Sequence, residues 1–284
     1  MSRRDFSKML KKILIYLLVL IASVWLVFPL YWAFTTSFKS KVDVFKPLFI
    51  PFIQYQPTLD NWINEITLRG DVIMTGLRNS LIAASISALL CTFLGSMAGY
   101  ALVRFRFRRW SNKDILLWFF SLRFLPPIAL ALPFFAIFMT LGLIDNVLAL
   151  IISYTVFFIP FATLVQYDVF RNIPVELEES AMVDGCSRTG AFLRVALPLS
   201  APGIIASFII CFAFAWNEFL FALVLTYKNS ITLPIVIAGA EHSQGVDFWY
   251  ICTRAVIAIT PPVILATLVQ RWIIRGLTLG ALKR

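Results

Sequence analysis

Six long apolar segments constrain this chain more than any other feature of its sequence. A helix that crosses about 30 Å of hydrocarbon needs roughly 20 apolar residues, and six segments reach that length: 13–34, 77–103, 115–139, 147–169, 203–225 and 255–274. Only 14% of the residues are charged, whereas about a quarter are charged in soluble domains. The sequence therefore predicts an all-α integral membrane protein with six transmembrane helices.

The basic residues indicate the orientation. Segments on the side of the two termini hold 17 Lys and Arg, counted with Arg271, and segments on the other side hold 5, when Arg78, Arg123 and Arg254 are left out as too near or within a span. Such an excess marks the cytoplasmic side. We therefore expect a cytoplasmic N-terminal segment (1–12), a transmembrane domain (13–274) and a cytoplasmic tail (275–284). The first apolar run exceeds the roughly 7–15 residues of a signal peptide's core, so we expect it to be retained as a span.

Several other functions are disfavoured by what the sequence lacks. The four cysteines form no C-x-x-C pair, which argues against a metal or redox site. The net charge of +10 fits membrane orientation and anionic lipid, so we expect no nucleic acid partner. A membrane enzyme would need clustered His, Asp or Ser, and the single histidine, His242, has no obvious partner. A stand-alone secondary transporter usually shows an internal repeat, and none is visible here.

Several spans carry residues that make a helix irregular or closely packed. "GSMAG" (95–99) is a small-xxx-small face that permits close helix approach. Prolines interrupt the third, fourth and sixth spans: Pro126, Pro127, Pro133, Pro160, Pro261 and Pro262. Each proline removes a backbone donor and tends to kink its helix. The kinks either shape a bundle interior with a function or serve packing alone.

A polar stretch, 171–202, separates the fourth and fifth spans and is expected in the cytoplasm. Pro174 suits a helix's first turn, the following glutamates favour its positive end, and Gly185 suits the position after its last turn. A short helix is therefore expected over 174–184. Ser187 can cap a second short helix.

The second helix is expected to end at Pro198 or Pro202, before the fifth span, because proline cannot continue a helix. Two short helices that meet at a glycine form a compact knob. A loop that only joined two spans could be shorter, since helix connections commonly take about 2–8 residues. The length of this loop therefore favours a docking role.

The knob resembles the EAA loop of ATP-binding-cassette (ABC) importer permeases, which reads E-A-A, three residues, G, nine residues, I-x-L-P. Ser180 replaces an alanine of that motif and Val195 its isoleucine. "RFLPP" (123–127), "WNEFLFAL" (216–223) and "RGLTLGALK" (275–283) resemble the second permease subunit of carbohydrate importers of the maltose-transporter type. The resemblance implies a MetI-like permease fold and these ATPase-coupling residues: Glu179, Ser180, Ala181, Asp184, Gly185, Leu197 and Pro198.

The same resemblance implies the partners and the location. We expect a second permease subunit in a heterodimer, two ABC ATPase subunits, and a periplasmic or lipid-anchored solute-binding protein, in a bacterial inner membrane. ATP and Mg²⁺ would bind the ATPase, because this chain contains no Gly-Lys pair and hence no phosphate-binding P-loop. We expect no cofactor on this chain and no enzymatic activity of its own. The expected cargo is a sugar, oligosaccharide or sugar derivative; glycerol phosphate, a polyol or another small polar solute is the alternative.

Arg123, Asn217 and Glu218 are candidates for the translocation path or its gate. A charge at the middle of a span costs about 2.5–3.5 kcal/mol on insertion scales and usually faces a bundle interior. The alternative is a structural ion pair or polar clamp between the third and fifth spans.

The loop before the last span is the candidate contact for the binding protein. By the same resemblance we expect the polar tip to reach into that protein and displace its sugar: Glu241, His242, Ser243, Gln244, Gly245 and Val246. Trp249 and Tyr250 are better explained as an interfacial aromatic belt. "DNW" (60–62) in the first outer loop is a second candidate contact.

Overall fold

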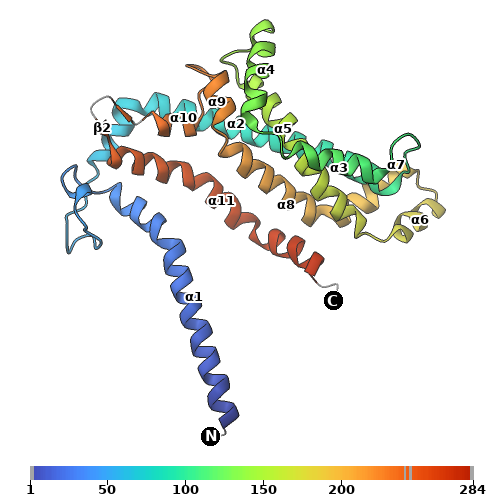
Figure 1. The fold of residues 1–284 in the computed structure, drawn as a ribbon, viewed down its shortest axis with the longest axis horizontal. Helices are drawn as coiled ribbons and strands as arrows, with labels where there is room; N and C mark the ends of the chain where they lie inside the picture. Colours follow the sequence, from blue (N-terminus) through green and yellow to red (C-terminus); the bar gives the residue numbers. More distant parts are fainter. Residues whose placement is uncertain (1–2, 240, 243–244, 282–284) are drawn as a thin grey trace. The chain divides into compact units, whose positions relative to one another are not determined.

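The computed structural model describes residues 3–239, 241–242 and 245–281, and the described chain is almost entirely helical (Figure 1). The helices are α1 (Arg3–Thr36), α2 (Asp60–Arg104), α3 (Asn112–Leu122), α4 (Pro127–Thr140), α5 (Val147–Arg171), α6 (Val175–Val183), α7 (Arg188–Ala191), α8 (Leu197–Trp216), α9 (Leu220–Leu225), α10 (Leu233–Ala238) and α11 (Phe248–Ala281). A 3₁₀ turn covers Asp43–Phe45, and two short strands, β1 (Glu241–His242) and β2 (Gly245–Val246), pair antiparallel. The chain divides into two compact units, residues 1–71 with 237–259, and residues 72–236 with 260–284.

Five helical stretches in the described chain are long and apolar enough to cross a membrane: Met9–Thr36, Asp60–Arg104, Val147–Arg171, Arg188–Trp216 and Phe248–Gln270. The pair α3 and α4 gives a sixth if the two are counted as one broken span. The expected all-α class with six apolar spans is therefore confirmed.

The expected third span, 115–139, is not one continuous helix. Helices α3 and α4 are bent by 86° at the break between them. Pro127 restricts the residue before it to extended backbone, and Pro126 accordingly has ψ 131°. The break falls at Pro126 and Pro127, whereas α5 continues across Pro160 and α11 across the adjacent pair Pro261 and Pro262, so adjacent prolines alone do not decide where a helix breaks.

Two helices extend well beyond the apolar segments that predicted them. Helix α2 begins at Asp60 rather than near 77, and α11 begins at Phe248 rather than near 255. Hydropathy detects the part of a helix that lies in hydrocarbon, and it does not detect polar turns that continue the same helix. Of these extra turns, residues 60–71 of α2 and 248–254 of α11 belong to the first compact unit.

The expected fifth span also differs from the sequence interpretation. It starts earlier, since α7 runs through a π-helical turn (Phe192–Ala196) into α8, and Leu197 N–H bonds to Phe192 O. Neither Pro198 nor Pro202 ends the second cytoplasmic helix, so that expectation was wrong. Pro198 lies in the first turn of α8, where a missing N–H costs little. The span then breaks after Trp216, and α9 follows.

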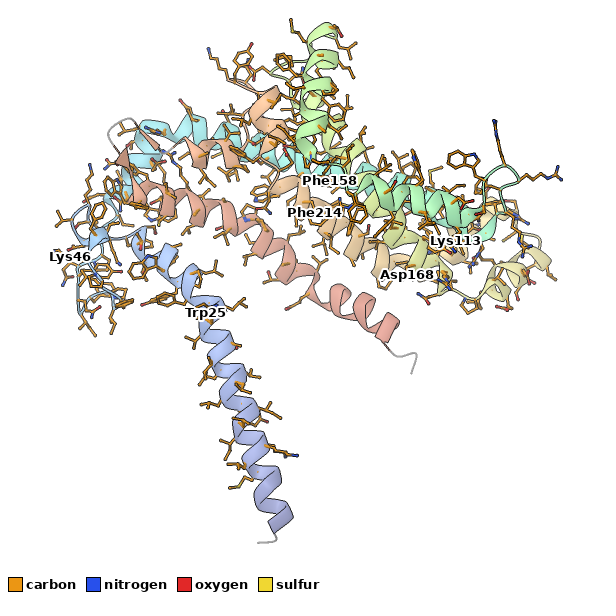
Figure 2. All side chains as sticks on the ribbon, viewed as in Figure 1. Trp25, Lys46, Lys113, Phe158, Asp168 and Phe214 are labelled. Carbon is orange, nitrogen blue, oxygen red and sulfur yellow. The ribbon has the colours of Figure 1, made fainter. Side chains whose placement is uncertain are left out.

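The core of the second unit is built where α2 and α5 approach closely. A Cβ added at Gly95 would lie 2.8 Å from Ala162 Cβ, and one at Gly99 would lie 2.7 Å from Tyr167 N. Only glycine fits at these two positions, as the small-xxx-small pattern predicts. Helix α5 also packs against α3 and α8, and Phe158 stacks on Phe214 with ring centroids 5.6 Å apart (Figure 2).

The first unit contains a folded segment after α1 that is organised around Lys39. This side chain is buried; its ammonium group donates to Leu48 O at 2.7 Å and lies 3.9 Å from the Trp32 ring centre. The Asn61 amide, also buried, donates to Ser37 O and Lys39 O. Asn61 of the "DNW" candidate is therefore an internal structural residue, and it does not present a surface for the binding protein.

Candidate functional site

The polar stretch after α5 forms the first of the two short helices expected for the knob, whereas the second, α7, continues into α8. Helix α6 covers Val175–Val183, with Pro174 just before it. Gly185 has φ +92°, a left-handed conformation that glycine adopts without a steric penalty. The Ser187 hydroxyl accepts the Gly190 N–H at the start of α7. The helix, the glycine turn and the cap that the sequence predicted are all confirmed.

The knob presents most of the motif residues to solvent. Glu179 and Ser180 on α6, Asp184 at its end and Gly185 are exposed, as is Pro198, while Ala181 and Leu197 are half-buried. A side chain added at Gly185 would meet no atom within 4 Å. The glycine is required by its backbone conformation, and the surface around it is open.

Glu178, one residue before the motif, fastens the knob to the end of α2. Its side chain is buried and accepts hydrogen bonds from Tyr100 Oη at 2.5 Å and from Arg104 Nε at 2.8 Å. The Arg104 guanidinium forms an ion pair with Glu178 and also donates to Ile173 O at 2.9 Å. One carboxylate therefore joins the knob to a transmembrane helix.

Aromatic side chains support the same attachment. The Tyr100 ring lies 4.5 Å from the Phe192 ring and 5.4 Å from the Phe170 ring, measured between centroids. Phe170 and Ala196 are fully buried beside Tyr100. The knob is thus packed as well as hydrogen-bonded, and α2, α5 and the π-helical turn meet at one point.

Arg123 lies at the end of α3, next to the break in the third span. Its guanidinium carbon is 5.3 Å from the Phe161 ring centre and 5.6 Å from that of Phe214. Such contacts stabilise a cation that has lost part of its water. In the described part of the chain, no ion pair joins Arg123 to Glu218, and the guanidinium lies beside both rings; its place on the path or in a clamp stays a prediction.

Asn217 and Glu218 occupy the break between α8 and α9. The Asn217 side chain donates to Ala213 O of its own helix. The Glu218 carboxylate accepts the backbone N–H groups of Phe221 and Ala222 and so caps α9 at its positive end. Glu218 therefore has a local structural role, and its place on the translocation path stays a prediction.

Asp145, between α4 and α5, holds the loop that follows α9. Its carboxylate accepts the backbone N–H groups of four successive residues, 227–230, at 2.9–3.2 Å. Burial raises the pKa of Asp145, but these hydrogen bonds outweigh burial and hold the pKa well below its usual range. The stabilisation is therefore complete above the ordinary pKa of about 3.9 and is lost only in stronger acid.

Helix α2 holds the same loop from another side. The Asn79 amide donates to Asn229 O and Ile231 O, and the Ser80 hydroxyl accepts the Leu233 N–H at 2.8 Å. The loop over 226–233 is thus rigidly fixed. Sequence reasoning missed this arrangement, since its partners lie 82 to 153 residues apart.

The expected binding-protein contact falls on a small hairpin. Glu241 pairs with Val246, and His242 pairs with Gly245. Ser243 and Gln244, which complete the candidate set, lie outside the described residues. The contact with the binding protein therefore stays a prediction.

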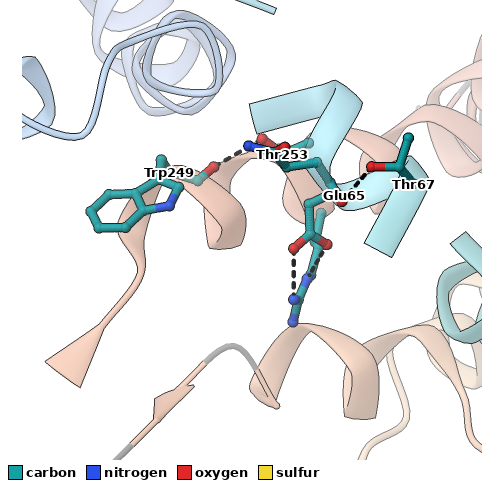
Figure 3. Close-up of polar contacts among 6 residues, drawn as sticks. Glu65, Thr67, Trp249 and Thr253 are labelled. Carbon is teal, nitrogen blue, oxygen red and sulfur yellow. Dashed lines mark hydrogen bonds and ion pairs between the residues drawn. The ribbon is translucent and has the colours of Figure 1, made fainter. Parts of the chain in front are cut away.

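A buried ion pair in the first unit was also missed. Glu65 on α2 accepts two hydrogen bonds from Arg254 on α11, at 2.7 and 2.9 Å (Figure 3). The exposed fractions of the two side chains are 2% and 1%. The available signal was a glutamate and an arginine next to apolar spans, but nothing in the sequence paired them.

The described residues contain no group of three or more His, Cys, Asp or Glu side chains that could hold a metal ion.

Solved structures share this fold. A chain of a bacterial ABC transporter involved in the import of the acidic polysaccharide alginate superimposes with a TM-score of 0.78, over 96% of this chain and 99% of that one, at 19% identity. A chain of the MetNI methionine ABC transporter gives 0.57, over 75% and 96%, at 18% identity. The expected MetI-like fold is confirmed by these likenesses.

Sequence relatives cover almost the whole chain. A trehalose/maltose transport system permease protein from Thermococcus litoralis is 31% identical over 98% of this chain and 99% of its own length. A trehalose transport system permease protein from Mycobacterium tuberculosis is 35% identical over 90% and 92%, and a sulfoquinovosyl glycerol transport system permease protein from Agrobacterium fabrum is 34% identical over 90% and 88%. Residues 91–279 match the model of one family. The chain belongs to that family, the inner membrane components of binding-protein-dependent transport systems.

Proposed function

We propose that this permease subunit carries a sugar, oligosaccharide or sugar derivative into the cell with energy from a separate ATPase. The knob at 174–198 carries the proposal, because it is built as a rigid docking surface fastened to α2 through Glu178. Sugar cargo is supported by the relatives, of which two are trehalose permeases and one a sulfoquinovosyl glycerol permease. Family membership argues against a stand-alone secondary transporter.

The knob would fit into a cleft of an ATPase subunit, with Glu179 and Ser180 at its surface. Closure of the ATPase dimer would then move α6 and, through Glu178, the end of α2. A second permease subunit would supply the other half of the path. Both termini would be cytoplasmic, as the distribution of basic residues indicates.

The path itself would pass Arg123 and the break between α8 and α9. Broken helices expose backbone carbonyl and N–H groups, which transporters use near their substrate sites. Arg123, Asn217 and Glu218 lie at two such breaks. This placement supports a role at the path or its gate.

Copurification and a ligand screen test the proposed function directly. A tag on this chain should retain an ABC ATPase and a second permease after solubilisation in mild detergent. The cognate solute-binding protein should be stabilised by a sugar in a thermal-shift screen, because a ligand that binds only the folded state raises the unfolding temperature. Isolation of this chain without an ATPase would contradict the proposed coupling to a separate ATPase. Stabilisation of the binding protein by amino acids alone would contradict a sugar cargo.

Deleting residues 241–246 tests the proposed contact with the binding protein. The complex should assemble and keep its basal ATP hydrolysis, because the loop over 226–233 is held independently by Asp145 and Asn79. Stimulation by the sugar-loaded binding protein should fall to the basal rate. A second variant replaces residues 241–246 with six Gly and Ser residues, which keeps the length of the chain at this point. It should lose stimulation as the deletion does. Full stimulation in either variant would count against the contact.

A further inference from the structure

The loop over 47–54 carries an apolar tip that protrudes from the first unit. Its exposed side chains include Phe49, Ile50, Phe52 and Ile53, of which Phe52 is 75% and Ile53 80% exposed. The sequence between Lys46 and Asp60 contains no charged residue. Large apolar groups held together in the open mark an interaction surface.

Hydrogen bonds within the loop fix the conformation of the tip. Phe52 N–H donates to Tyr55 O at 2.9 Å, and the Gln54 side chain accepts the N–H groups of Phe49 and Ile50. Phe52 has φ +64°, a strained value for a bulky side chain that persists only when the surroundings impose it. Hydrogen bonds therefore hold Phe52 and Ile53 outward.

The loop folds back along α1 instead of continuing away from it. The Tyr31 hydroxyl donates to Phe49 O at 2.6 Å, and the Phe49 ring lies 5.4 Å from Trp32 and 6.3 Å from Phe28. With a rise of 1.5 Å per residue, Phe28 and Trp32 lie about 12 and 6 Å before the end of α1 at Thr36. Phe49 therefore lies at the depth of the last apolar turns of that helix.

Those turns mark the boundary of the hydrocarbon. About 20 residues are needed to cross it, and counting from Ile13, just after Lys12, leads to Trp32. Tyr and Trp gather at this level in membrane proteins, and Tyr31 and Trp32 are the residues that the loop contacts. The tip thus contacts the outer apolar end of a helix long and apolar enough to cross a membrane.

We propose that the tip formed by Phe49, Ile50, Phe52 and Ile53 inserts into the headgroup and upper acyl region of the bilayer and anchors the outer segment of this permease to lipid. The lack of charge favours lipid over a polar protein surface, and the fixed outward side chains lose little conformational freedom on insertion. With the N-terminus in the cytoplasm, as proposed above, the leaflet is the outer one. The anchor does not depend on the identity of the cargo.

Depth-dependent quenching tests the anchor in the intact transporter. The complex is placed in nanodiscs of palmitoyl-oleoyl phosphatidylcholine, and a nitrobenzoxadiazole dye is attached to Ile53→Cys or Ile50→Cys. The half-buried native thiols are removed by Cys186→Ser and Cys252→Ser, while Cys91 and Cys211 are buried. Val42→Cys is the matched control, since Val42 is 68% exposed in the same segment but lies beside Lys41 and Asp43.

Lipids brominated on the acyl chain should quench the dye at residues 50 and 53 several-fold more than at residue 42, and emission at 50 and 53 should be blue-shifted. The solute-binding protein should leave both signals unchanged. Water-like emission without lipid quenching at residue 53 would overturn the anchor. So would a blue shift without lipid quenching, which indicates cover by a protein chain, or a shift that needs the binding protein.

Discussion

Replacing Glu178 with alanine is expected to lower uptake by at least about tenfold while the complex still assembles. The change removes the acceptor of Tyr100 and Arg104, and hydrogen bonds to a charged group contribute about 1.5–3 kcal/mol. Since 1.4 kcal/mol is a factor of ten, the ratio of attached to detached knob falls about 10- to 150-fold. Arg104 is partly solvated, which favours the lower end of that range.

The measurement is sugar uptake together with ATP hydrolysis in proteoliposomes. Hydrolysis should persist and respond weakly to the loaded binding protein, because the ATPase still closes but no longer moves α2. Tyr100→Phe removes one hydrogen bond and should have a smaller effect. Glu176→Ala is the matched control, since Glu176 is exposed on the same helix, and its uptake should stay near wild type.

Glu179→Ala tests docking to the ATPase separately from the attachment of the knob to α2. Glu179 is exposed, so its loss should weaken retention of the ATPase during purification and leave the fold of the knob intact. Glu178→Ala should show the opposite pattern, with normal retention and altered protease sensitivity of the loop over 171–202. Normal uptake in Glu178→Ala, or equal effects of the two variants on ATPase retention, would contradict the division of roles.

Local rules were enough to predict the knob. The helix over Val175–Val183, the positive φ of Gly185 and the Ser187 cap each depend on residues at most four positions away. Capping and turn preferences act at that range. This helix, the glycine turn and the cap could therefore be predicted from the sequence of the polar stretch alone.

The attachment of the knob to α2 could not be predicted from the sequence, because it depends on contacts between residues far apart in the chain. Glu178 meets Arg104 from 74 positions away, and the spacing of the motif drew attention to its neighbour Glu179 instead. The prolines show the same limit. Pro126 with Pro127 lies at a helix break, whereas Pro160 and the adjacent pair Pro261 and Pro262 lie inside continuous helices, so the presence of proline alone does not locate a break.

The buried ion pair of Glu65 and Arg254 gives the second large expected effect. Arg254→Ala should destabilise the protein by about 3–5 kcal/mol, since it leaves a buried carboxylate without its cation. The two residues join α2 to α11 over a sequence separation of 189. The loss should therefore loosen the start of α11, which directly follows the hairpin at 241–246.

The stability of the purified complex in nanodiscs is measured as the unfolding temperature at one fixed scan rate, because unfolding of such complexes is commonly irreversible. The exposed pair of Asp43 and Lys46, 2.9 Å apart, provides the control. Lys46→Ala should leave the unfolding temperature nearly unchanged, because ion pairs exposed to solvent contribute little to stability.

The double variant Glu65→Leu with Arg254→Met decides what the pair contributes. Replacing a buried ion pair by apolar residues of similar volume is often neutral or stabilising, so the double variant should recover most of the unfolding temperature lost in Arg254→Ala. If uptake stays low while stability recovers, the charges hold α11 in a position that transport needs. If uptake also recovers, the pair serves folding alone. An unfolding temperature in Arg254→Ala equal to that in Lys46→Ala would show that the bidentate contact is not formed in the membrane.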